Sequence, residues 1–71
     1  MKRAALSDLD IYRAAQALVR QHGIAASLEA AMMADEMVAR GDPSGRNVWL
    51  RILRAVDELQ RDTPLADESL Q

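Results

Sequence analysis

The stretch VARGDPSGRNVW, residues 38–49, decides how this chain folds. Gly41 falls where one run of helical periodicity stops, and glycine adopts the left-handed backbone conformation that ends helices at little cost. Asp42 is a good N-cap, and Pro43 suits the first position of a helix, where its missing N–H loses nothing. The stretch therefore predicts the end of one helix and the start of the next. Gly45 leaves a second possibility open, in which Asp42 to Gly45 form a type I turn and the helix begins just after them.

The same stretch contains the tripeptide Arg40-Gly41-Asp42, which also occurs in cell-adhesion ligands. An exported adhesive loop usually comes with a secretory signal or with disulfide bonds. The chain has no cysteine, and only the short apolar run Ala4 to Leu6 follows its basic N-terminus. We therefore interpret the tripeptide as the local signal that ends one helix and begins the next.

Periodic apolar residues on both sides of this stretch predict three helices. Their approximate ranges are 8–22, 26–40 and 43–60. Ser7 is the expected N-cap of the first helix, and Gly23 lies just past its end. Short connections favour antiparallel neighbours, so we expect an all-α fold, a small three-helix bundle that forms one domain over residues 1–61. Residues 62–71 lack a periodic apolar face and are predicted to be a flexible, disordered C-terminal tail.

The apolar faces of these helices predict a thin core around a tryptophan anchor. The expected core residues are Leu18, Val19, Ala34, Val38, Trp49, Ile52 and Val56. With 71 residues and 3% aromatic residues, the domain should have a net stability of only ~3–5 kcal/mol. The angle between the second and third helices stays open: they are either nearly antiparallel or cross steeply, as in a helix-turn-helix.

Composition indicates a soluble chain. The formal net charge is −2, and 28% of the residues are charged, so there is no overall attraction to phosphate. The absence of cysteine excludes disulfide bonds and thiolate chemistry. No stretch approaches the length of a membrane-spanning helix. We expect a cytoplasmic protein with no membrane partner.

The sequence shows no pattern of catalytic or metal-binding residues. His22 is the only histidine, and a metal site would need three or four ligands from a chain that offers neither a second histidine nor a cysteine. At the last turn of the first helix, His22 is instead expected to interact with the carbonyl end of that helix. No phosphate-binding glycine loop, nucleophile elbow or paired-carboxylate cleft is visible. We therefore expect no enzymatic activity, no cofactor and no metal.

Several short motifs lie along residues 10–60: Asp10-Ile11-Tyr12, His22-Gly23, Ala34-Asp35, Gly41-Asp42, and Trp49-x-x-Ile52 with Leu59. Together they resemble the motifs of a group of very short bacterial helical proteins of unknown function. The resemblance implies a plan of helix, His-Gly, helix, Gly-Asp, helix. It implies no activity.

The second predicted helix is apolar nearly all round and offers a candidate protein-contact surface. Leu28, Met32 and Ala39 form a strip outside its expected core face, and flexible methionines suit adaptable contacts. Met33, Asp35, Glu36 and, on the third helix, Leu50 complete the candidate set. We predict a small helical interaction module without catalytic activity, which forms a homodimer or docks on a larger, unidentified protein.

Asp35 has two competing interpretations within that set. It is flanked by apolar residues, so a carboxylate there needs a hydrogen-bond donor if it is buried. A structural hydrogen bond from one of four side chains is the preferred interpretation, and a role in binding is the alternative. The possible donors are Tyr12, His22, Trp49 and Arg51.

Nucleic-acid binding by a helix-turn-helix is the alternative function, because the third helix carries basic and amide side chains on its outer face. These are Arg46, Asn47, Arg51 and Arg54, with Arg61 beyond them. Asp57 and Glu58 interrupt the same face, where pairs of Arg54 with Glu58 and of Asp57 with Arg61 are expected. These acids and the negative net charge argue against nucleic acid as the main partner.

Overall fold

The computed structural model describes residues 7–61, and all regular structure within that range is helical. The elements are helix α1 over Asp8–His22, a short 3-10 helix η1 over Gly23–Ala25, helix α2 over Ala26–Ala39 and helix α3 over Pro43–Arg61. The predicted all-α class is confirmed, and each predicted helix range agrees with the observed one to within a residue. The predicted tail, residues 62–71, lies outside the described residues.

Helix α1 begins with a capping box. The Ser7 hydroxyl accepts the Asp10 backbone N–H at 3.1 Å, and the Asp10 carboxylate accepts the Ser7 N–H at 3.4 Å. This exchange satisfies two backbone donors that a helix start otherwise leaves unpaired. The helix ends at His22, where Gly23 follows with a φ of 58°.

The connection between α2 and α3 is fixed by its own side chains and backbone. The N–H of Gly41 (φ 73°) donates to the Val38 carbonyl at 3.0 Å, and that of Asp42 donates to the Met37 carbonyl at 2.8 Å. This pair of bonds is a Schellman motif. The Asp42 carboxylate in turn accepts the Gly45 N–H at 2.9 Å, as the N-cap of α3. The helix therefore starts at Pro43, and the alternative with a turn and a later start does not occur.

Gly45 lies at a point of close approach between the two helices. A Cβ at this position would lie 2.6 Å from Oδ2 of Asp42 and 2.7 Å from Sδ of Met37. The glycine thus costs some helix propensity and makes room for the cap and for the packing of α2. Because Asp42 caps α3 and Arg40 pairs with Glu36, the tripeptide 40–42 is structural, as predicted.

At the other end of the α2–α3 pair, polar side chains hold the two helices together. Ser27 on α2 donates its hydroxyl to the Asp57 carboxylate of α3 at 2.6 Å. Gln60 donates its side-chain amide N–H to the Gly23 carbonyl at 2.8 Å. These bonds join η1 and the start of α2 to the end of α3.

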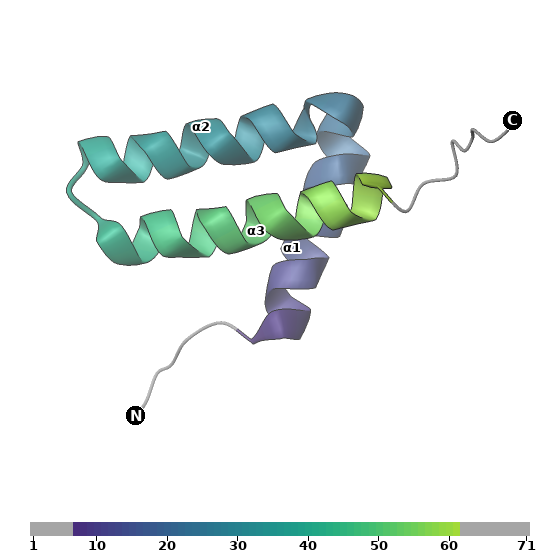
Figure 1. The fold of residues 1–71 in the computed structure, drawn as a ribbon, viewed down its shortest axis with the longest axis horizontal. Helices are drawn as coiled ribbons and strands as arrows, with labels where there is room; N and C mark the ends of the chain where they lie inside the picture. Colours follow the sequence, from purple (N-terminus) through teal and green to yellow (C-terminus); the bar gives the residue numbers. More distant parts are fainter. Residues whose placement is uncertain (1–6, 62–71) are drawn as a thin grey trace, which may run out of the picture.

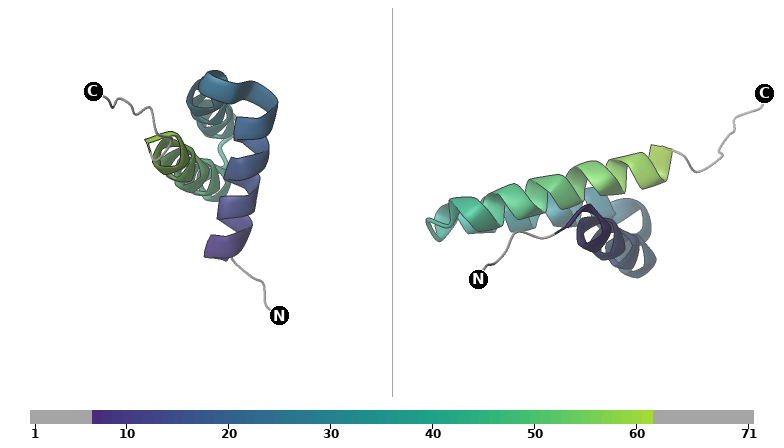
Figure 2. Two further views of the ribbon diagram at one scale, coloured as in Figure 1. Left: turned by 90° about the vertical axis from the view of Figure 1, so that its right-hand side faces the viewer. Right: turned by 90° about the horizontal axis from the view of Figure 1, so that it is seen from below.

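Helices α2 and α3 lie side by side and antiparallel, and α1 crosses α3 at a steep angle (Figures 1 and 2). The contact of α2 with α3 is the most extensive, followed by that of α1 with α3, while α1 and α2 touch least. The structure is therefore a helical hairpin crossed by α1, and the predicted up-down-up three-helix bundle is not confirmed. The open question about α2 and α3 is answered in favour of the antiparallel arrangement.

The core is built mostly from small side chains. Its buried residues are Ile11, Ala15, Ala26, Ala30, Ala34, Ile52 and Val56. Val56 is the largest fully buried side chain among the described residues. Of the predicted core, Ala34, Ile52 and Val56 are buried, and Leu18, Val19 and Trp49 are half-buried around it.

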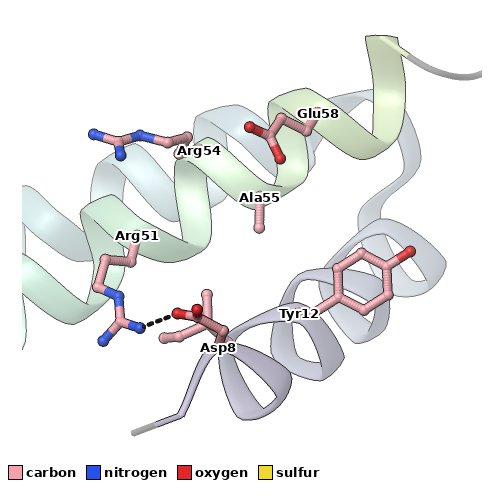
Figure 3. Close-up of a pocket in the computed structure, with 7 residues that line it drawn as sticks. Asp8, Tyr12, Arg51, Arg54, Ala55 and Glu58 are labelled. Carbon is pink, nitrogen blue, oxygen red and sulfur yellow. Dashed lines mark hydrogen bonds and ion pairs between the residues drawn. The ribbon is translucent and has the colours of Figure 1, made fainter. Parts of the chain in front are cut away.

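The prediction for Val38 was wrong, because this side chain is 57% exposed. It lies four residues beyond Ala34, and each four-residue step along a helix turns by about 40°. Helix α1 crosses nearer the other end of the hairpin, where residues of its first turns face Ala55 and Glu58 of α3 (Figure 3). Neither α3 nor α1 therefore covers Val38.

Candidate protein-contact surface

Three large apolar side chains form a line on the side of α2 that faces away from the core. Ile24 of η1 is 96% exposed, and Leu28 and Met32 of α2 are 64% and 54% exposed. We call these three residues the outer ridge. The four-residue spacing brings side chains of neighbouring turns together on one side of a helix. The outer ridge is therefore a continuous apolar strip about two turns long.

The opposite side of α2 carries the inner ridge, which consists of Ala26, Ala30 and Ala34. These alanines are at most 3% exposed. Leu28 lies two positions from both Ala26 and Ala30, which at 100° per residue places it about 160° away from each around the helix axis. The outer ridge thus faces almost directly away from the buried face.

The predicted contact residues fall into two groups. Leu28, Met32 and Ala39 are exposed, as expected for a strip outside the core. Met33 and Leu50 are only partly exposed. Ile24 was missed, because the sequence interpretation treated residues 23–25 as a linker and stopped the strip at the helix start. Its position four residues before Leu28 was the available signal.

The preferred interpretation of Asp35 was wrong. Its side chain is exposed, and no polar or charged residue is buried in the described part of the chain. Asp35 follows Met32 by three residues, so it lies on the outer side of α2 and its carboxylate stays in water. Arg51, one of the proposed donors, pairs instead with Asp8 of α1 at 2.8 Å.

Carboxylates flank the outer ridge. Glu29 is half-buried, and Asp35 and Glu36 are exposed. Arg40 is the one basic residue within residues 24–40, and it pairs with Glu36, one turn away, at 3.0 Å. Neither Glu29 nor Asp35 forms an ion pair within residues 7–61. The apolar strip therefore lies in an acidic surround.

The candidate nucleic-acid face is only partly available. Arg46, Asn47 and Arg54 are exposed, while Arg51 is half-buried and engaged with Asp8 (Figure 3). In the described residues the predicted pairs of Arg54 with Glu58 and of Asp57 with Arg61 are not formed. The Asp57 carboxylate accepts the Ser27 hydroxyl instead, because α2 lies alongside this turn of α3.

A groove of about 270 Å³ lies between α1 and α3. It is lined by Asp8, Ile11, Tyr12, Arg51, Arg54, Ala55 and Glu58 (Figure 3). Its charged groups are two carboxylates and two guanidinium groups, so they favour neither an anion nor a cation. Tyr12, at the edge of the groove, is 44% exposed. This arrangement supplies no selective chemistry for a small ligand.

Residues 7–61 contain no cluster of three or more histidine, cysteine, aspartate or glutamate side chains placed to hold a metal ion. His22 is exposed at the last turn of α1, where the sequence placed it. Within the same range, no helix combines the length and the apolar character needed to cross a bilayer.

Comparison with protein-family models, with curated proteins and with solved structures found no match to this chain. The case for the outer ridge as a contact surface therefore depends on its geometry and chemistry.

Proposed function

We propose that this chain is a small helical protein-interaction module without catalytic activity, and that the outer ridge is its contact surface. The observation that supports the proposal is the line of Ile24, Leu28 and Met32, with more than half of each side chain exposed. Isolated exposed apolar residues are common on soluble proteins, but a continuous strip bordered by charges is typical of interaction sites.

The strip is suited to modest affinity. Each large apolar side chain that becomes well buried contributes about 1.5–3 kcal/mol, from which the cost of association must be subtracted. Three such side chains alone support a dissociation constant that is micromolar or weaker. An amphipathic helix that lies along α2 is the simplest partner element, because both helices then present side chains at the same spacing.

The three helices act together as the support for this surface. The proposal includes the predicted single domain over residues 1–61 and the predicted cytoplasmic location. The single domain is supported by the packing of α1 on α3 and by the bonds that tie η1 and α2 to α3. A single cooperative transition, with coincident melting by circular dichroism and by Trp49 fluorescence, is expected for such a unit.

Nucleic-acid binding remains the alternative, with less support. A helix-turn-helix places its second helix at a steep angle to the first so that the second can enter the major groove. Here α3 lies alongside α2, and α1 crosses behind it (Figure 1). The exposed basic residues Arg46 and Arg54 share α3 with the acidic residues Asp57 and Glu58. Few cationic side chains are therefore available to displace counterions from DNA.

Affinity capture with the tagged chain from the cells that produce it tests the proposal. The parent is compared with Leu28→Glu plus Met32→Glu, and with the control Leu9→Glu plus Val38→Glu, which changes two other exposed apolar residues. A protein retained by the parent and the control but lost with the outer-ridge variant is the expected result. Equal retention by all three folded proteins would contradict the proposal. Nucleic acid retained at physiological salt and lost in Arg46→Ala plus Arg54→Ala would favour the alternative.

A further inference from the structure

We infer that the outer ridge docks a basic amphipathic helix of another protein. The inference rests on the proposed function and names the chemistry of the partner. It follows from three properties of this side of α2: its length, its apolar line and the charges beside that line.

The length of the surface fits a helix of a few turns. Ile24 to Met32 spans about 12 Å along the axis, and the line continues to Glu36 over about 18 Å in total. A partner helix with apolar residues at intervals of three and four positions would present two or three side chains to this strip. A single extended strand would leave its backbone N–H and C=O groups without partners on the side of a helix.

The charges beside the outer ridge select the sign of the charge on the partner. Glu29, Asp35 and Glu36 flank the line, and only Glu36 has a cationic neighbour, Arg40. Lysine or arginine side chains beside the apolar stripe of the partner would reach these carboxylates while their methylene groups cover apolar surface. Such pairs at the rim of an interface raise the rate and the selectivity of association more than its final affinity.

The same charges argue against a second copy of this chain as the occupant. A twofold contact through the outer ridge would bring the three carboxylates of each copy around one interface. The one arginine in this segment, Arg40, is already engaged with Glu36 in its own copy. Like charges placed together oppose association, whereas a basic helix would be attracted by these carboxylates.

Binding of two synthetic helical peptides to the full chain tests the inference. Both peptides carry one leucine stripe at helical spacing, and the flanking residues are lysine and arginine in the first and glutamate in the second. Fluorescence anisotropy of the labelled peptides measures the affinity. The basic peptide is expected to bind at least about tenfold more tightly than the acidic one, with an advantage that shrinks as salt rises.

Matched variants locate the contact. Met32→Glu should weaken binding of the basic peptide by about tenfold or more, and Val38→Glu should not weaken it. Asp35→Lys should weaken it severalfold, and Glu58→Lys, which makes the same charge change on α3, should not. Retained folding of every variant is checked by circular dichroism.

Three outcomes would overturn the inference. Equal affinity for the two peptides would show that the carboxylates do not select the partner. Sedimentation that shows a parent dimer, lost in Met32→Glu, would identify a second copy as the occupant. Binding of neither peptide would also reject a basic helix. If the captured protein still depends on Leu28 and Met32, the proposed function stands without this inference, and if it does not, both fail.

Discussion

The two ridges of α2 both consist of apolar residues, but one ridge is buried and the other is exposed. The inner ridge, Ala26, Ala30 and Ala34, is almost completely buried, while the outer ridge, which carries the much larger Ile24, Leu28 and Met32, is mostly exposed. The two faces differ in side-chain size, and the smaller apolar side chains are the buried ones. Small side chains inside let α2 approach α3 closely, and the large apolar surface that would normally fill a core is left outside.

This difference indicates where stability and recognition reside. Changes on the inner face or on the residues that pack against it should alter the free energy of unfolding. Changes on the outer face should alter contacts with a partner and leave the fold intact. The following predictions test that separation, in order of decreasing effect on stability.

Ile52→Ala should have the largest effect. Ile52 is 4% exposed and belongs to the cluster of buried residues that includes Ala26 and Ala30. Loss of its side chain leaves a cavity, so the free energy of unfolding should fall by about 2–5 kcal/mol, comparable to the whole stability of so small a domain. Urea titration followed by circular dichroism measures the change. A fall below about 0.5 kcal/mol would show that this position does not hold the core together.

Ala30→Leu tests the inner ridge directly. Ala30 is fully buried, so added methylene groups must push α2 away from its neighbours, at a cost of about 1–3 kcal/mol. The control is Ala39→Leu, the same exchange at an exposed position of the same helix, which should change the melting temperature little. Equal melting of the two variants would mean that the close approach of α2 is not required.

Asp42→Ala should have an intermediate effect, because it removes the N-cap that holds the start of α3 against α2. The Gly45 N–H loses its acceptor, and the expected cost is about 0.5–2 kcal/mol. Ser44→Ala, at an exposed position of the same turn, is the matched control. Thermal melting of the two proteins side by side gives the difference in stability. An unaltered melting temperature for Asp42→Ala would show that this cap does not stabilise the hairpin.

Leu28→Ala should have the smallest effect on stability. The side chain is 64% exposed, so its truncation should change the free energy of unfolding by no more than about 0.5 kcal/mol. The same urea titration used for Ile52→Ala provides the comparison. A loss of 2 kcal/mol or more, on the order of a buried leucine, would show that the outer ridge is part of the core.

The helix boundaries could be predicted because they depend on local chemistry. Ser7 with Asp10, and Gly41 with Asp42 and Pro43, determine caps and turns through atoms only a few residues apart. These interactions form in the same way wherever the helices later pack. That is why the predicted ranges match the observed elements.

The packed faces were predicted less well because they depend on the direction in which α1 crosses the hairpin. A helical wheel places Val38 with Ala34 but does not show that α1 lies at the other end of α3. Asp35 was wrongly predicted to be buried for the same reason, because its surroundings were inferred from α2 alone. Ile24 was missed for a local reason, because a 3-10 turn extends the strip before α2 begins.

A smooth row of alanines holds two helices close together but does little to fix their sliding position. Moving α3 along α2 by one turn, about 5.4 Å, would place similar small residues in the same spaces. The bond of Ser27 to Asp57 and that of Gln60 to the Gly23 carbonyl would both break in such a shift, and Gly45 would no longer face Met37. These few polar and glycine contacts at the two ends therefore set the register of the hairpin, while the alanines between them determine its width.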